Sequence, residues 1–312
     1  MPEESWERRI IEQLATAGLR EQTRARRWGI FFKLLLFGFM FVALFAAIGA
    51  LTESQRTCLD KCTAQVELRG EIDADGPASA ENVMAGLQAA FKNKGTQGVV
   101  LRINSPGGSP VQAGEINDEI RRLRTLYPTI PIYAVVEEMC ASGAYYAAVA
   151  ADKIYVDKAS LIGSIGVIID GFGFVGTMDK LGVERRALTA GENKTFLDPF
   201  SPITQQQRDY AQQMLAEIHQ QFIAAVKAGR GARLKESPEL FSGLVWNGAR
   251  GVDLGLADGF GGVDYVAREV IKSEDVVDFT VKENISERLA RKFGATLGRS
   301  LGAVVGHSVR WR

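Results

Sequence analysis

An uncharged apolar run near the start of the chain sets the first limit on how this sequence folds. Residues 34–51 form a stretch of 18 residues without a charge, and 28–32 extend it upstream across Lys33. A helix of that length crosses the hydrocarbon core of a bilayer, whereas the apolar core of a cleavable signal peptide is shorter. About 30 residues precede the run, so we predict an uncleaved transmembrane helix over 28–51.

Flanking cations indicate the orientation of this helix. The cations nearest the run are Arg20, Arg24, Arg26, Arg27 and Lys33 before it, and Arg56, Lys61 and Arg69 after it. Because cytoplasmic flanks carry the excess of cations, we predict that the N-terminal segment 1–27 is cytoplasmic. The stem 52–63 and all that follows it then lie outside the cytoplasm.

Charge and cysteine content exclude some classes of partner and ligand. Lysine plus arginine and aspartate plus glutamate each number 37, so the net charge is zero and no nucleic-acid partner is indicated. Cys58 and Cys62 lie four apart in the stem, where a disulfide and two free thiols are equally consistent with the sequence. Cys140 lies in an apolar run and is expected in the core. The absence of a nearby histidine argues against a zinc site.

Strand-like and helix-like segments alternate over 64–272, and this alternation predicts the fold class. The strand candidates are 65–72, 98–103, 131–136, 153–156 and 165–169. The helix candidates are 80–93, 110–126 and 142–151. Strands joined by helices form a largely parallel sheet with right-handed crossovers, so we expect one α/β domain.

Two further helical patterns follow. In 204–229 an apolar stripe at four-residue spacing comprises Tyr210, Met214, Ile218, Phe222 and Val226. Such a stripe is most often core, and a partner interface is the alternative. The tail 273–312 is basic, and its apolar residues also repeat every four positions. It could lie on an anionic membrane, dock on a neighbouring subunit or stay free in solution, and the sequence does not choose among these.

A serine among small residues marks the candidate reactive group. Ser142 lies in Met139-Cys140-Ala141-Ser142-Gly143-Ala144, between a strand pattern and a helix pattern. At a helix N-terminus, backbone N–H groups lack intrahelical partners and favour developing negative charge, which suits a nucleophile. The alternative is that Ser142 only caps the helix.

A glycine-rich loop offers a partner for that serine. Ser105-Pro106-Gly107-Gly108 follows a buried strand, and its glycines allow the loop to turn N–H groups toward a bound carbonyl oxygen. Together with the N–H of Gly143, such a donor could form an oxyanion hole, although for Pro-Gly-Gly alone a simple turn between a strand and a helix is the better explanation. The Gly-Lys-Ser/Thr ending of a phosphate-binding loop is absent.

The base is harder to identify from residues alone. The chain has two histidines: His219 among polar residues that suggest a solvated face, and His307 in the basic tail. Neither histidine is therefore a good candidate for the base of a Ser-His-Asp triad. A lysine base must be neutral, which costs roughly 4.6 kcal/mol at pH 7 for a pKa of about 10.4, unless burial or a nearby cation removes that cost. The lysines of the domain that remain open are Lys153, Lys158, Lys180, Lys194 and Lys227.

Three motifs resemble a known family in order and spacing. They are Asn104-Ser105-Pro106-Gly107-Gly108, Ala141-Ser142-Gly143-Ala144-Tyr145-Tyr146 and Ile162-Gly163-Ser164-Ile165-Gly166-Val167. Together they resemble the signal peptide peptidase A (SppA) family of membrane-anchored Ser-Lys peptidases with the ClpP/crotonase fold. The resemblance covers about 66–271 and includes the segments 229–231, 243–248 and 255–258.

The resemblance implies a role for each matching residue. Ser142 would be the nucleophile, and Lys194, in Gly191-Glu192-Asn193-Lys194, its base. Ser164 would help to hold the lysine amine, and Gly107 and Gly143 would be the oxyanion donors. Ala144 stands where the family often has glycine, and the pattern around Lys194 is loose, so the serine assignment is more specific than the lysine assignment.

The function implied is that of a serine endopeptidase acting through an acyl-enzyme, without metal or cofactor. It would degrade cleaved signal peptides, with other membrane-derived or misfolded polypeptides as further candidates. It would be anchored in the bacterial inner membrane with its catalytic domain in the periplasm. One copy of each motif suggests the short form, a homo-oligomeric ring whose sites combine serine and lysine from adjacent protomers. The alternatives are a crotonase-type acyl-CoA enzyme and a non-catalytic membrane scaffold; the anchor and Ala-Ser-Gly disfavour the first.

Overall fold

The computed structural model describes residues 22–24, 26–45, 58, 60–235 and 237–281. The chain divides into two units, one containing the N-terminal helix and the other comprising 56–282, and each is described by itself. The predicted tail 273–312 is described only as far as 281, so its amphipathic part and His307 lie outside the described residues.

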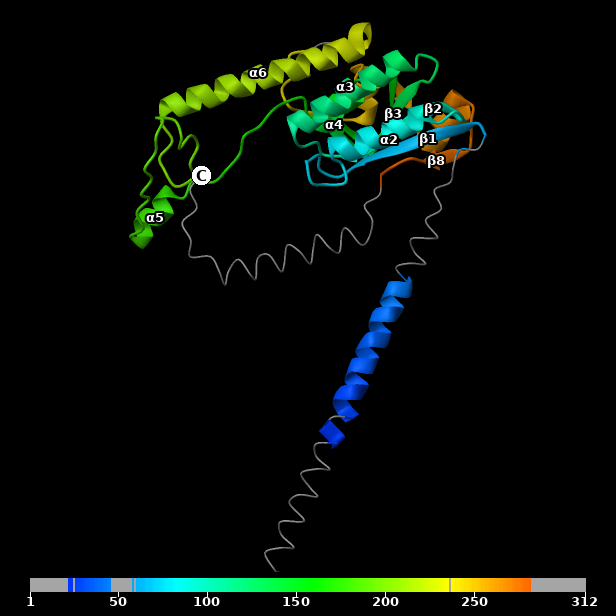
Figure 1. Cartoon of the computed structure of the whole chain (residues 1–312). Helices are drawn as coiled ribbons and strands as arrows, with labels where there is room; N and C mark the ends of the chain where they lie inside the picture. The colour runs from blue at the N-terminus through cyan, green and yellow to red at the C-terminus, as the bar shows by residue number, and fades with distance from the viewer. Residues whose placement is uncertain (1–21, 25, 46–57, 59, 236, 282–312) are drawn as a thin grey trace, which may run out of the picture. The chain divides into compact units, whose positions relative to one another are not determined.

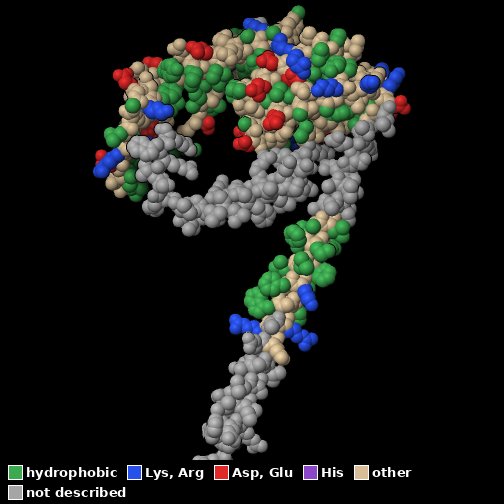
Figure 2. Space-filling view, viewed as in Figure 1, with side chains coloured by type: hydrophobic (Ala, Val, Ile, Leu, Met, Phe, Trp, Pro, Cys, Tyr) green, Lys and Arg blue, Asp and Glu red, His purple; other side chains and the backbone are tan. Residues whose placement is uncertain are grey.

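The N-terminal helix runs over Gln22–Phe45, with a mean hydropathy of 2.2. Its described side chains are exposed and largely apolar, and Figure 2 shows the basic side chains gathered toward one end of it. By length and composition it can cross a membrane, as a membrane anchor or as a signal sequence. The predicted span 28–51 thus coincides with an observed helix up to Phe45, and its remainder lies outside the described residues.

A mostly parallel sheet forms the centre of the folded domain (Figure 1). Its strands are β1 (Cys62–Arg69), β2 (Thr96–Ser105), β3 (Ile132–Ala141), β4 (Lys153–Val156), β5 (Leu161–Gly163), β6 (Val245–Asn247), β7 (Gly259–Phe260) and β8 (Val276–Asp278). The main path has the order β6-β5-β3-β2-β1-β8, while β4 pairs with β3 and β7. Every pair is parallel except β5 with β6. The mixed α/β class predicted from the alternation is confirmed.

Helices cover the sheet and extend beyond it. They are α2 (Ala80–Lys92), α3 (Pro110–Leu126), α4 (Gly143–Ala148), α5 (Val175–Leu181), α6 (Gln205–Arg230), α7 (Gly248–Asp253), α8 (Val263–Tyr265), the 3-10 turn η1 (Gly231–Arg233) and the π-helical turn η2 (Val266–Ile271). Helices α2, α3 and α4 pack together against the sheet, and one apolar core joins them to β1, β2 and β3. The 26-residue α6 carries its N-terminal end and α5 away from this core (Figure 1).

Local signals in the sequence explain the elements that were predicted correctly. Helix α3 begins where Ser109 caps it and Pro110 occupies its first turn, so its predicted bounds agree with the structure. Helix α6 begins after Thr204, whose side chain forms a capping box with Gln207. Strand β4 also has its predicted bounds, and β1 to β3 overlap theirs.

The strand predicted over 165–169 is wrong. The strand in this part of the chain is β5, and it ends at Gly163. Ser164 has a φ of 49°, in the left-handed region, which turns the backbone away from the extended path. Within the described part of the chain no strand pairs with 165–169, and Ile168 is 79% exposed.

The apolar stripe of α6 is core only in its C-terminal half. Phe222 and Val226 are buried, whereas Tyr210 is 60% exposed. The N-terminal half of the helix lies beyond the sheet and its covering helices, so the prediction of a core stripe is wrong there. Exposed apolar residues also occur in the preceding segment, at Phe172, Leu181 and Leu188.

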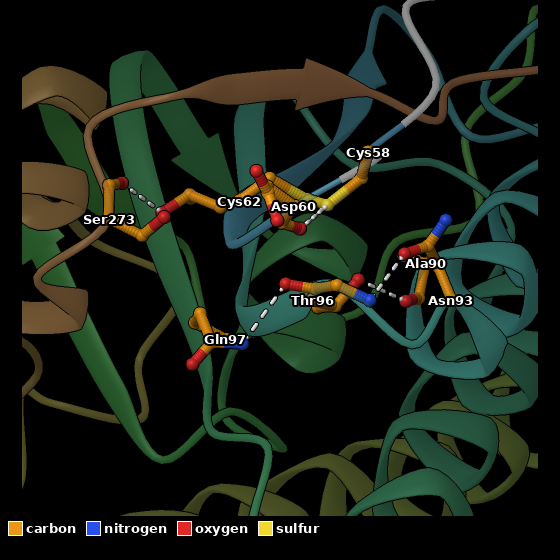
Figure 3. The surroundings of a disulfide bond; sticks show 10 residues. Cys58, Asp60, Cys62, Ala90, Asn93, Thr96, Gln97 and Ser273 are labelled. Carbon is orange, nitrogen blue, oxygen red and sulfur yellow. Dashed lines mark hydrogen bonds between the residues drawn. A yellow bond between two sulfur atoms is a disulfide. The ribbon is translucent and has the colours of Figure 1, made fainter.

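A disulfide joins Cys58 to Cys62 at the start of β1 (Figure 3). Both cysteines are buried and pack with Val277 of β8. The Cys62 N–H donates to the Gly95 carbonyl at 3.0 Å, in the turn before β2. Of the two states left open by the sequence, the structure has the disulfide. Cys140 is fully buried and free, as expected, and burial raises the pKa of its thiol, which keeps it protonated.

A buried ion pair fastens the C-terminal end of α6 to the sheet. Arg230, whose side chain is 1% exposed, donates to both carboxylate oxygens of Asp258 at 2.7 and 2.9 Å and to the Gly255 carbonyl at 2.8 Å. Asp258 also accepts from the N–H of Ile154 in β4.

The same end of α6 passes close to the end of α4. A Cβ at Gly229 would lie 2.1 Å from the Val149 carbonyl oxygen, so glycine is required there.

Candidate active site

Ser142 lies in the sharp turn between β3 and α4, with a φ of 53° and a ψ of −125°. This conformation is strained for a residue with a side chain. The backbone N–H of Ser142 donates to the Gly163 carbonyl at 2.9 Å, and its carbonyl accepts from Tyr146 at 3.0 Å. Its side chain makes no capping hydrogen bond to α4. The alternative that Ser142 only caps the helix is therefore wrong.

The loop 106–108 packs directly against this turn. A Cβ at Gly107 would lie 2.7 Å from the Gly143 nitrogen and 2.8 Å from the Ser142 Cβ, so only glycine permits this approach. The N–H of Gly107 donates to the Ser105 hydroxyl at 3.1 Å. It is thus engaged within its own loop, and Gly107 contributes close packing to the arrangement.

Gly108 and Gly143 present the better placed pair of N–H groups. Among the described residues neither N–H has a hydrogen-bond acceptor, and Gly143 stands at the first position of α4, where helical partners are lacking. The Gly108 nitrogen lies 3.4 Å from the position of a Cβ on Gly143. The family resemblance assigned Gly107 as the donor of this loop; the residues Pro-Gly-Gly alone do not indicate which N–H is left free.

A small cavity of about 130 Å³ opens beside Ser142. Its lining is largely apolar and includes Gly108, Ala113, Gly143, Tyr146, Val167, Ile168, Ile218 and Phe222. Tyr146 and Phe222 are in ring contact at 5.1 Å, which joins α4 to α6 at the wall of the cavity. No charged residue lines the cavity in the described part of the chain, so it suits an apolar side chain of modest size.

Ser164 is brought close to Ser142 through the backbone. Gly163, the residue before it, pairs with Ala141 and accepts the N–H of Ser142. The N–H of Ser164 donates to the Leu244 carbonyl at 2.8 Å. Both serines have a positive φ, so the backbone is strained at both positions; Ser142 lines the cavity and Ser164 does not.

Lys194 is not brought to Ser142 within one chain. It is exposed, does not line the cavity, and lies in a turn in which its N–H donates to the Gly191 carbonyl at 3.2 Å. The segment between α5 and α6 lies at the N-terminal end of α6, away from the sheet (Figure 1). Nearby, Phe196 contacts Tyr210 on α6, whereas the cavity touches the same helix at Ile218. Those two positions are about 12 Å apart along the helix axis.

The other candidate lysines offer no substitute. Lys153, Lys158, Lys180 and Lys227 are all exposed, and none lines the cavity. Lys158 and Lys227 instead lie over the rings of Phe260 and Phe241. Across the described residues, one chain therefore supplies a serine, N–H donors and a cavity, but no buried lysine beside them.

The described residues contain no group of three or more histidine, cysteine, aspartate or glutamate side chains that could hold a metal ion.

His219 was missed by sequence reasoning. It was predicted on a solvated face, but its side chain is partly buried, and its Nε2 lies 3.0 Å from the carbonyl oxygen of Ile165. The contact joins residues 54 positions apart, so the polar residues beside His219 in the sequence could not reveal it.

Comparison with known proteins assigns the family. The profile of peptidase family S49 matches residues 125–277, which include Ser142, Ser164 and Lys194. The chain belongs to peptidase family S49. The resemblance drawn from the three motifs is confirmed, and the mostly parallel sheet is consistent with the ClpP/crotonase fold.

Similar proteins carry several names. A putative signal peptide peptidase SppA of Enterococcus faecium is 30% identical over 203 residues, which are 65% of this S49 chain and 58% of that protein. A putative protease of Methanocaldococcus jannaschii is 29% identical over 220 residues, 69% of this chain and 70% of that protein. A protein of Brucella abortus named Na(+)/H(+) antiporter NhaA is 37% identical over 244 residues, 77% of this chain but 32% of that protein.

The S49 chain spans about a third of the antiporter-named protein and somewhat over half of the Enterococcus relative. The antiporter name therefore describes a protein about three times as long as the matched segment. In the part of this chain that the structure describes, one helix is long and apolar enough to cross a membrane.

Proposed function

We propose that this chain is a membrane-anchored serine endopeptidase in which Ser142 attacks a peptide carbonyl. The observation that carries the proposal is the conformation of Ser142: a strained serine without a capping bond, beside free N–H groups and an apolar cavity. A carbonyl oxygen that develops negative charge would be stabilised by the N–H groups of Gly143 and Gly108. Gly107 would serve by its close packing against Ser142.

Lys194 is the proposed base, and it acts from a neighbouring copy of the chain. As the neutral amine it takes the Ser142 proton during attack and returns it to the leaving amine; water then hydrolyses the acyl-enzyme. Ser164 would hold the amine. The separation of Lys194 from the cavity within one chain supports a shared site. The exposed apolar residues of 168–188, together with Tyr210 in the first half of α6, supply a surface for the neighbour in a homo-oligomeric ring.

We place the enzyme in the bacterial inner membrane with its catalytic domain in the periplasm. The N-terminal helix carries Arg24, Arg26, Arg27 and Lys33 toward its beginning, which favours a cytoplasmic N-terminus. The disulfide between Cys58 and Cys62 supports the same placement, because disulfides persist in oxidising compartments.

The proposed substrates are cleaved signal peptides, together with other membrane-derived or misfolded polypeptides. The apolar cavity beside Ser142 fits side chains of the kind that signal peptides contain. The name of the Enterococcus relative agrees with this substrate class. A chain anchored at the membrane would meet such peptides where they are released.

A fluorophosphonate probe tests the nucleophile. The full chain in detergent should be labelled, and Ser142→Ala should abolish both labelling and cleavage of a signal-peptide substrate. Ser201→Ala provides a matched control, because its hydroxyl bonds to Asp198 away from the cavity and its loss should leave labelling intact. Labelling that persists in Ser142→Ala would show that another residue reacts with the probe and would overturn Ser142 as the nucleophile. A wild-type chain that is neither labelled nor active would favour the non-catalytic scaffold.

Subunit mixing tests the shared site. Ser142→Ala and Lys194→Ala chains should each be inactive, and co-assembled oligomers of the two should recover part of the activity. Lys180→Ala, another exposed lysine of the same segment, should stay active. If the mixed oligomers show no recovery while wild type is active, the base and the nucleophile come from one chain and the shared-site proposal fails.

A further inference from the structure

One wall of the cavity beside Ser142 is not held by regular secondary structure. Residues 166–168 line the cavity but belong to no helix or strand. In the described part of the chain, the one backbone hydrogen bond made by these residues runs from the Gly166 N–H to the Ser164 carbonyl, at 2.9 Å. A wall with so few bonds of its own needs an external contact if the cavity is to keep a fixed width.

His219 supplies that contact. Its Nε2 lies 3.0 Å from the carbonyl oxygen of Ile165, the residue just before the wall. A carbonyl oxygen only accepts hydrogen bonds, so Nε2 carries the proton and donates it. The side chain of Ile165 is fully buried in the core. Ile165 is therefore fixed on two sides, by its apolar side chain and by its carbonyl.

Helix α6 connects this bond to a second part of the cavity wall. Ile218 and Phe222, which flank His219 on the same helix, line the cavity. Phe222 is also buried against Tyr146 of α4. One rigid helix thus carries both a wall of the cavity and the donor that fastens the other wall. The His219 bond therefore links the two walls to each other.

We propose that His219 is a positioning residue that sets the width of the cavity and so determines which substrate side chains it accepts. The inference rests on the proposed peptidase function and concerns the same site. His219 acts through Ile165 and the wall at 166–168, and it takes no part in moving the proton of Ser142. Without the bond, the wall can move outward and the cavity grips an apolar side chain less well.

Replacing His219 with two different amides tests this role. The amide nitrogen of glutamine is as many bonds from Cα as Nε2 of histidine, whereas that of asparagine is one bond closer to the backbone. His219→Gln should therefore keep the bond to Ile165, and His219→Asn should lose it. Gln220→Leu, at an exposed neighbouring position that does not line the cavity, is the control.

The readout is KM and kcat on peptides that differ only in the residue expected to fill the cavity, leucine or glycine. For the leucine peptide, His219→Asn should raise KM about fivefold, the effect of one neutral hydrogen bond, with kcat little changed. His219→Gln should stay within about twofold of wild type, as should both variants on the glycine peptide. Equal behaviour of the two amide variants, or an equal loss on both peptides, would overturn the inference.

The same assay separates this inference from the proposed function. If Ser142→Ala cleaves the leucine peptide as well as wild type, the peptidase proposal fails and the role of His219 fails with it. If cleavage requires Ser142 but His219→Gln and His219→Asn are alike, the peptidase proposal stands and the role of His219 alone is wrong. A thermal melt of each variant identifies unfolding, which would lower kcat on both peptides.

Discussion

Arg230→Met should destabilise the folded domain strongly, because it removes the buried partner of Asp258. The Arg230 side chain is 1% exposed and makes three hydrogen bonds, two to Asp258 and one to the Gly255 carbonyl. Methionine fills much of the same volume but donates nothing. The substitution leaves a carboxylate that is 11% exposed and a backbone carbonyl without this donor.

The expected cost follows from the chemistry of broken buried ion pairs. Removing one partner of such a pair typically costs about 3–5 kcal/mol. Arg233 still reaches Asp258 at 3.0 Å and is 40% exposed, so it shields part of the remaining charge. We therefore expect about 3 kcal/mol, at the lower end of that range. For a domain of this size the melting temperature should fall by roughly 6–12 °C.

Chemical and thermal denaturation of the full chain in detergent measure this cost. Arg233→Gln is the matched control: it removes an exposed arginine from the same carboxylate and should cost about 0–1 kcal/mol. Arg230→Met combined with Asp258→Leu removes both charges, and it should be less destabilised than the two single variants together.

The pH dependence gives an independent check. Burial acts to raise the pKa of Asp258, but the hydrogen bonds and positive charge of Arg230 outweigh burial and hold that pKa below its usual value. A lowered folded-state pKa stabilises the fold above the unfolded pKa of about 4, and this stabilisation is lost as the pH falls through the folded pKa. The gap between wild type and Arg230→Met should therefore narrow below about pH 4. The reasoning is refuted if Arg230→Met costs no more than Arg233→Gln, or if the gap does not narrow.

Three further substitutions test other parts of the structure. A Cβ at Gly108 would lie 2.2 Å from the Ile72 carbonyl oxygen, so Gly108→Ala must shift the proposed oxyanion donor; kcat should fall about 100–1000-fold with circular dichroism unchanged. Replacing Cys58 and Cys62 together by serine should lower the free energy of unfolding by about 2 kcal/mol, as should adding reductant to wild type. Tyr145→Phe removes a buried hydroxyl that donates to a backbone carbonyl at 2.8 Å; it should cost about 1–3 kcal/mol in denaturation and leave fluorophosphonate labelling intact.

The elements that sequence predicted well are those whose limits are encoded locally. Ser109 and Pro110 mark the start of α3, and the strand–helix alternation was enough to predict a parallel sheet. The strand predicted over 165–169 failed because an apolar run does not reveal whether another strand lies beside it. Ser164 then turns the backbone, and hydrophobicity alone does not indicate that turn.

The features of the candidate site that could not be predicted from the sequence depend on contacts between residues far apart in the chain. The motif containing Ser142 was informative because nucleophile, turn and helix start fall within a few residues. His219 acquires its role only through Ile165, 54 positions away. From the sequence alone, Arg230 would be expected on the surface. In the fold, α6 places it in contact with Asp258. The exposure of Lys194 likewise depends on how far α6 carries its segment from the sheet.

Backbone strain is the strongest reason to assign reactivity to the turn at Ser142. Ser142, Ser164, Leu197 and Lys272 are the non-glycine residues with a positive φ in the described part of the chain, and each such position costs about 1–3 kcal/mol. A serine that merely caps a helix needs no strain, since capping residues adopt extended backbone and their side chains accept an N–H of the first turn. Ser142 has neither an extended backbone nor a side-chain bond to the first turn of α4. Its own N–H donates to the Gly163 carbonyl, which holds the sharp turn in place. The strained turn therefore lowers the stability of the fold, and no capping hydrogen bond from the Ser142 side chain offsets this loss. The arrangement is accounted for if it presents an uncommitted hydroxyl to a substrate.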